Sequence, residues 1–113
     1  MTENKMSDNQ IIAQFQAYQQ QMQSIYIQRE NMKMQTLEID KALEELEASK
    51  EENAFKIVGP IMIKKSKDDI QTDLKEQKST LELRTKTLNS AEEKITGKIK
   101  EMEADIRRII EKK

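Results

Sequence analysis

The chain has 113 residues, of which 35% are apolar, 36% charged and 4% aromatic. Its 20 basic and 21 acidic residues give a formal net charge of −1 with the signs interspersed, so no concentrated positive field is available to bind nucleic acid. Scarce bulky apolar residues argue against a thick globular core, while abundant Glu, Lys, Gln and Leu with helical periodicity are typical of long helices. We expect a single extended helical domain over residues 1–113.

Several classes of function are disfavoured by what the sequence lacks. It has neither cysteine nor histidine, the side chains most used for metal binding and for acid–base chemistry at neutral pH. It has no glycine-rich phosphate-binding motif, no apolar run near the roughly 18 residues of a membrane span, and no signal peptide at its N-terminus. We therefore expect no enzyme, no cofactor or metal, no membrane contact and a cytoplasmic location.

A first long helix is predicted from Asp8 to Glu52. Ser7 and Gln10 have the spacing of a capping box at its start. Steps of four and three residues from Ile11 follow a nearly continuous apolar stripe, as in a coiled coil: Ile11, Phe15, Tyr18, Met22, Ile25, Arg29, Met32, Thr36, Ile39, Leu43, Leu46 and Lys50. Arg29 and Thr36 interrupt the stripe, and we expect them to fix register at some cost in stability.

The central segment NAFKIVGPIMIKKS, residues 53–66, contains the only proline and one of two glycines. Gly59-Pro60 favours a turn, and the β-branched residues around it predict a β-hairpin over residues 55–64. A lone hairpin is marginal in water and has two unpaired edges, and this one would carry apolar residues on both faces. We expect partner subunits to cover it; the alternative is that it folds back onto its own helices.

A second helix is predicted from Lys67 to Lys112, with Ser66 as its N-cap and acidic residues in its first turn. Its stripe is read as Ile70, Leu74, Gln77, Leu81, Arg84, Leu88, Ala91, Ile95, Ile99, Met102, Ile106 and Ile109. The step from Ile95 to Ile99 breaks the alternation, which indicates a stutter around Gly97; we interpret it as a register defect, with a functional hinge as the alternative. Two helices of equal length joined by a reversal predict an antiparallel coiled coil, with both termini at one end.

The central motif resembles prefoldin subunits of the β class. The resemblance rests on the run Phe55-Lys56-Ile57-Val58-Gly59-Pro60-Ile61-Met62-Ile63-Lys64 between two long helices, and it covers nearly the whole chain. Phe55 stands where tyrosine is common in that class, and Lys65-Ser66 replaces the usual continuation towards an acidic residue.

What the resemblance implies is a mainly α fold, a long antiparallel two-helix coiled coil whose central hairpin joins a multi-subunit β-barrel base. It implies an ATP-independent chaperone, assembled as a heterohexamer of two α-type and four β-type subunits. Such an assembly binds unfolded client proteins at its distal coiled-coil tips and delivers them to a group II chaperonin. The subunit-assembly residues would then be Phe55, Ile57, Val58, Gly59, Pro60, Ile61, Met62 and Ile63.

The ends of the two predicted helices carry apolar residues suited to the tip function. Ile11 and Ile109 belong to the apolar stripes, and each has a second isoleucine next to it that does not, Ile12 and Ile110. One helix pair cannot bury both neighbours, and exposed apolar patches usually mark interaction sites. The candidate client-binding residues are Ile11, Ile12, Phe15, Tyr18, Ile106, Ile109 and Ile110. For Ile11, Phe15, Ile106 and Ile109, the alternative is that they only close the coiled coil.

Two other functions compete with this interpretation. One is a structural coiled-coil scaffold without client binding. The other is a nucleic-acid-binding coiled coil, which the balanced charge disfavours.

Overall fold

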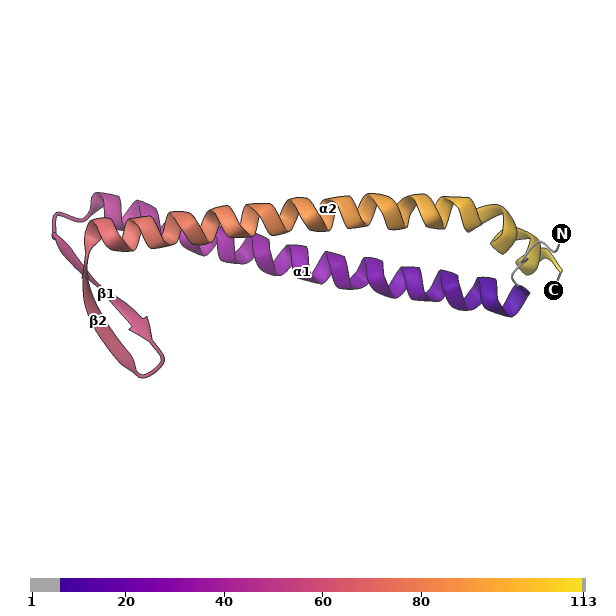
Figure 1. The fold of residues 1–113 in the computed structure, drawn as a ribbon, viewed down its shortest axis with the longest axis horizontal. Helices are drawn as coiled ribbons and strands as arrows, with labels where there is room; N and C mark the ends of the chain where they lie inside the picture. The colour runs from indigo at the N-terminus through magenta and orange to yellow at the C-terminus, as the bar shows by residue number, and fades with distance from the viewer. Residues whose placement is uncertain (1–6, 113) are drawn as a thin grey trace, which may run out of the picture. The chain divides into compact units, whose positions relative to one another are not determined.

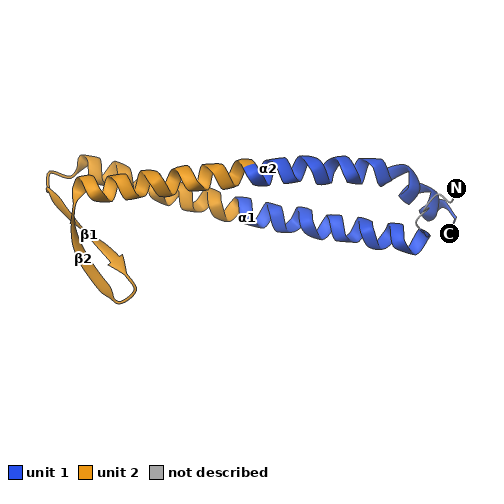
Figure 2. Cartoon of the chain, viewed as in Figure 1, with its two compact units in different colours: residues 1–29, 87–113 blue, residues 30–86 orange. Residues whose placement is uncertain are grey.

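The computed structural model describes residues 7–112, which form two long helices separated by a β-hairpin (Figure 1). The elements are α1 (Asp8–Ala48), β1 (Asn53–Val58), β2 (Ile61–Ser66) and α2 (Lys67–Glu111). The chain divides into two compact units: unit 1 comprises residues 1–29 and 87–113, and unit 2 comprises residues 30–86 (Figure 2). The predicted fold class, a mainly α chain with one central antiparallel hairpin, is confirmed.

Both helix starts are capped as predicted. The backbone N–H of Gln10 donates to the Ser7 hydroxyl at 3.2 Å, and the N–H of Ser7 donates to the Gln10 side-chain oxygen at 2.8 Å. This reciprocal pair is a capping box. At the start of α2, the N–H of Asp69 donates to the Ser66 hydroxyl at 3.2 Å. These bonds satisfy amide groups that the first turn of a helix leaves without partners.

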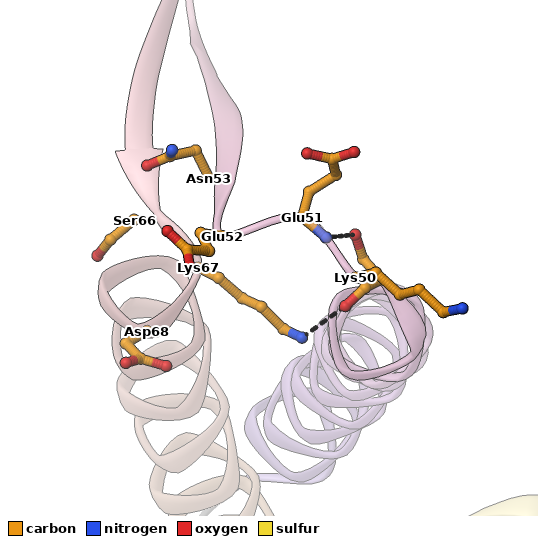
Figure 3. A pocket seen from close by; sticks show the side chains of 8 residues that line it. Lys50, Glu51, Glu52, Asn53, Ser66, Lys67 and Asp68 are labelled. Atoms are coloured by element: carbon orange, nitrogen blue, oxygen red, sulfur yellow. Dashed lines mark hydrogen bonds between the residues drawn. The ribbon is translucent and has the colours of Figure 1, made fainter.

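The end of α1 differs from the prediction, because the helix stops at Ala48 rather than Glu52. The Lys67 amine, from the first turn of α2, donates to the main-chain oxygen of Ser49 at 2.9 Å (Figure 3). It also donates to the main-chain oxygen of Glu47 at 3.5 Å. The backbone N–H of Lys67 donates to the Glu52 oxygen at 2.8 Å. Lys67 thus takes the place of a further helical turn as partner for these carbonyls. Lys50, the last predicted stripe residue, lies beyond the helix and is exposed.

In unit 1, the packed seam between α1 and α2 is centred on four buried isoleucines, Ile11, Ile25, Ile95 and Ile109. It also contains an ion pair. The Arg29 guanidinium lies 2.8 Å from the Glu92 carboxylate and donates to the Asn89 side-chain oxygen at 3.2 Å. Arg29 therefore has polar partners on the facing helix at a position that would otherwise be apolar.

In unit 2, Ile39 and Leu81 are buried and polar side chains again occupy part of the seam. The Thr85 hydroxyl lies 3.8 Å from the Met32 sulfur and donates to the Leu81 main-chain oxygen at 2.8 Å. The Lys78 amine lies 2.6 Å from the Asp40 carboxylate. Its hydrogen bond to that carboxylate raises the pKa of Lys78 above the ordinary 10.5.

The exposure of the side chains on α2 gives a stripe that differs in part from the predicted one. From Leu74 onwards, buried or half-buried side chains on α2 recur at alternating steps of four and three residues: Leu74, Lys78, Leu81, Thr85, Leu88, Glu92, Ile95, Ile99, Met102, Ile106 and Ile109. Ala91 and Thr96 are half-buried as well. Gln77 and Arg84, which the prediction placed on the stripe, are exposed. The prediction followed apolar residues and so missed the seam positions that are occupied by polar side chains with partners, such as Lys78 and Thr85. On this stripe, Glu92, Ile95 and Ile99 keep the alternation near Gly97, whereas the predicted stripe passes through Ala91; the stutter stays a prediction.

The hairpin pairs β1 with β2 in antiparallel register from Asn53 opposite Ser66 to Val58 opposite Ile61. Its strands are thus longer than the predicted 55–64. Gly59 and Pro60 form a two-residue turn, and Gly59 has a φ of +59°. Positive φ at the first central position is required by the II′ class of hairpin turn, and glycine adopts it without steric cost. No helix within residues 7–112 is long and apolar enough to cross a bilayer.

Candidate functional site

Two exposed apolar surfaces are the candidate functional sites of the chain. The first, the hairpin surface, lies in unit 2 and consists of Phe55, Ile57, Val58, Ile61, Met62 and Ile63, all of which are exposed. The register places Ile57 opposite Met62, with Phe55 two residues along on the same face. Ile57 is 72% exposed. Water-exposed aliphatic and aromatic groups at this density indicate a surface made for contact with another chain.

The other face of the hairpin lies near α2 and makes two partly exposed ion pairs with it. Lys56 and Lys65 share that face with Val58, Ile61 and Ile63. Their amines lie 3.8 Å and 3.5 Å from the carboxylate of Asp73 on α2. The hairpin therefore contacts its own helix through two lysines, and the six apolar side chains stay uncovered. The alternative in which the hairpin covers them by folding back onto the helices does not occur in the single chain.

Gly59 and Pro60, the remaining predicted assembly residues, form the turn of the hairpin. Their part in the surface is geometric. The two-residue turn fixes the register, and the register determines which side chains share a face.

The second surface, the terminal groove, lies in unit 1 where the first turns of α1 face the last turns of α2. It has a volume of about 250 Å³. Its apolar lining comes from Ile12, Phe15, Ile106, Ile109 and Ile110, and its polar lining from Gln16 and Gln19. An adjoining hollow of about 480 Å³ shares Phe15, Ile106 and Ile110 and is edged by Glu103, Arg107 and Glu111.

The structure separates the seven predicted tip residues into groove residues, buried residues and Tyr18, which is neither. Ile12, Phe15, Ile106 and Ile110 line the terminal groove, and Ile110 is 66% exposed. Ile11 and Ile109 are buried at 7% and 5% exposure, so they close the helix pair, although Ile109 also borders the groove. Tyr18 is half-buried and does not line the groove. In each pair of neighbouring isoleucines, Ile11–Ile12 and Ile109–Ile110, the first side chain is buried and the second is accessible to solvent.

Sequence reasoning missed Gln16 and Gln19 as groove residues. The available signal was the absence of charge: residues 9–28 contain no Asp, Glu, Lys or Arg in a chain that is 36% charged. At the edge of this unit, the Asp8 carboxylate lies 3.9 Å from the Arg108 guanidinium and 3.7 Å from the Lys112 amine. These exposed pairs link the start of α1 to the end of α2 but contribute little stability.

Both sites are lined mainly by apolar side chains, which suit contact with other chains. Within residues 7–112, no group of three or more acidic side chains is arranged to hold a metal ion. The exposed hairpin and the paired helices together define a coiled-coil subunit that leaves an apolar sheet for other chains to complete.

Comparison with known proteins identifies the family. The family model described as "Prefoldin subunit" matches residues 9–113. The chain belongs to the prefoldin subunit family, as the resemblance of residues 55–64 indicated.

The relatives are β subunits from archaea. The chain is 38% identical to the prefoldin subunit beta of Pyrococcus abyssi over 81% of its own length and 80% of the relative. It is 35% identical to that of Archaeoglobus fulgidus over 88% of its length and 87% of the relative. The crystal structure of the prefoldin beta subunit from Thermococcus strain KS-1 superposes with a TM-score of 0.79 and 32% identity, covering 96% of each chain. Membership of this family implies a chaperone-type function and assembly with other subunits.

Proposed function

We propose that this chain is the β-type subunit of an ATP-independent cytoplasmic chaperone, and that it holds unfolded polypeptide in the terminal groove. The observation that carries the proposal is an accessible apolar groove, with Ile110 66% exposed at its edge, in a chain that is 36% charged. An unfolded client offers exposed apolar side chains, and their transfer from water into such a groove is favourable.

We propose further that the hairpin surface joins this subunit to others in a heterohexamer of two α-type and four β-type subunits. A two-stranded sheet has unpaired edges that accept strands from other chains. Several grooves in one assembly raise the effective concentration for a single client, so each can bind weakly. Release to a group II chaperonin then needs no nucleotide, because a competing site suffices.

The experiment uses a double variant in which two isoleucines of the groove are replaced by serine, Ile12→Ser and Ile110→Ser together. The matched control is Met34→Ser, which removes an exposed apolar side chain from unit 2. We expect the groove variant to keep its assembled mass in light scattering. It should bind an unfolded client roughly tenfold more weakly, because less apolar surface leaves water on binding. Client binding and suppression of aggregation should be unchanged in the control.

Equal client binding by the groove variant and the wild type would refute the groove as the client site. It would leave the scaffold function, in which the coiled coil has a structural role alone.

A further inference from the structure

The two helix segments that form the terminal groove differ in charge, although the α2 residues that line it are isoleucines. The α1 wall comes from residues 9–28, which hold no charged residue and eight glutamines. The facing segment of α2, residues 87–112, holds 12 charged residues, and three of these, Glu103, Arg107 and Glu111, edge the adjoining hollow. A coiled-coil helix ordinarily carries charged side chains beside its seam, so a charge-free first half of α1 calls for a role other than pairing with α2.

Two of these glutamines face the groove. Gln16 and Gln19 line it next to Ile12 and Phe15, and both are exposed. Neither side-chain amide bonds to another residue in the part of the chain that the structure describes. By contrast, Gln10 is engaged in the capping box and Gln28 donates to the Ser24 hydroxyl. The amides beside the apolar floor are therefore open to a ligand.

An amide in this position suits the main chain of an unfolded protein. When apolar side chains of a client enter the groove, the neighbouring main-chain N–H and C=O groups lose water, which is costly unless they find partners. A glutamine amide both donates and accepts, so it can pair with either group. It also carries no charge, so it does not select clients by the sign of their side chains.

We propose that Gln16 and Gln19 hydrogen-bond the main chain of an extended polypeptide whose apolar side chains occupy the terminal groove. This inference rests on the proposed function and specifies its ligand as extended chain. A helix would not use these amides, because its main-chain groups are already paired within the helix. The same wall of α1 in unit 1 continues to Tyr26 and Ile27, which are both exposed, so a segment longer than the groove finds further apolar contact.

The experiment measures a preference between two probes in the assembled full-length protein. One probe is an extended apolar peptide, and the other is the same peptide with N-methylated main-chain amides, which cannot donate. The variant is Gln16→Met with Gln19→Met, which keeps side-chain length and helix propensity but removes the amides. The matched control is Gln20→Met with Gln21→Met, two exposed glutamines of the same helix that do not line the groove.

We expect the wild type and the control to prefer the unmethylated peptide by roughly two- to tenfold for each hydrogen bond that methylation removes. The Gln16/Gln19 variant should bind the two peptides equally. A preference that survives in this variant overturns the inference. A change in assembled mass for this variant, but not for the control, also overturns it, because the wall would then be an interface between copies of the chain.

The Ile12→Ser and Ile110→Ser variant separates this inference from the proposed function. If it weakens both peptides while the Gln16/Gln19 variant retains the preference, the groove binds clients and only the main-chain contact is refuted. If it weakens neither peptide, the groove is not the client site and both proposals fail.

Discussion

At the scale of single residues, the two glycines have opposite roles. Gly59 needs its positive φ for the hairpin turn. Gly97 lies in the interior of α2, and a Cβ placed on it would meet no atom within 4 Å. A helical glycine in open space destabilises the helix, because its unfolded backbone has more freedom to lose.

We therefore expect Gly97→Ala to increase the free energy of unfolding by about 0.5–1 kcal/mol. The measurement is urea unfolding followed by helical circular dichroism. Gly59→Ala is the contrasting variant and should lower stability, because alanine is strained at positive φ. A Gly97→Ala protein that unfolds at lower urea than the wild type would show that the glycine serves a bend in the helix.

Residue chemistry also explains where the sequence misled. A stripe chosen for apolarity passed through Gln77 and Arg84, although Lys78 and Thr85 occupy the less exposed positions. Such side chains can occupy a seam when they have partners, here Asp40 for Lys78 and Met32 for Thr85. Those partners come from the other helix, so their pairing was not visible in the α2 sequence itself.

At the scale of elements, helix starts were predictable and the end of α1 was not. Ser7 with Gln10, and Ser66 with Asp69, are caps within four consecutive residues. The partner of the last α1 carbonyls is Lys67, which follows the entire hairpin in the sequence. A local motif can be recognised by spacing, whereas a cap from a distant segment requires the fold.

We expect Lys67→Met to destabilise the last turn of α1 by roughly 0.3–1 kcal/mol, because the carbonyls of Glu47 and Ser49 lose a cationic donor at a helix C-terminus. Hydrogen exchange of residues 44–48 is the measurement, and it should become faster. Lys50→Met is the control, because it removes an exposed lysine from the same connection. Equal hydrogen-exchange rates in the two variants would mean that the hydrogen bonds of Lys67 do not stabilise the end of α1, and that only its positive charge matters.

At the scale of the whole molecule, the hairpin is the element that a single chain leaves unfinished. The sequence predicted its position, its turn and its need for partners. It could not predict that Lys56 and Lys65 lie beside Asp73, because ion pairs between separate elements depend on how those elements pack. The number and type of the partner chains likewise depend on surfaces that belong to other proteins.

We expect Ile57→Asp to disrupt the assembled state, because a carboxylate in an apolar sheet interface costs several kcal/mol. Mass by light scattering, alone and with an α-type subunit, is the measurement. Met34→Asp places the same charge at an exposed apolar position outside the hairpin and should assemble normally. An Ile57→Asp protein of unchanged mass would place the subunit contact elsewhere.

The charge-free wall of α1 also determines how its contacts can be observed. Residues 9–28 contain no lysine and no arginine, so amine-reactive cross-linkers have no side chain to modify there and trypsin has no bond to cleave. If clients bind the terminal groove as we propose, contact maps made with these reagents would detect α2 but miss residues 9–28 of α1. A photoreactive group introduced at Gln20 would make the opposite wall visible.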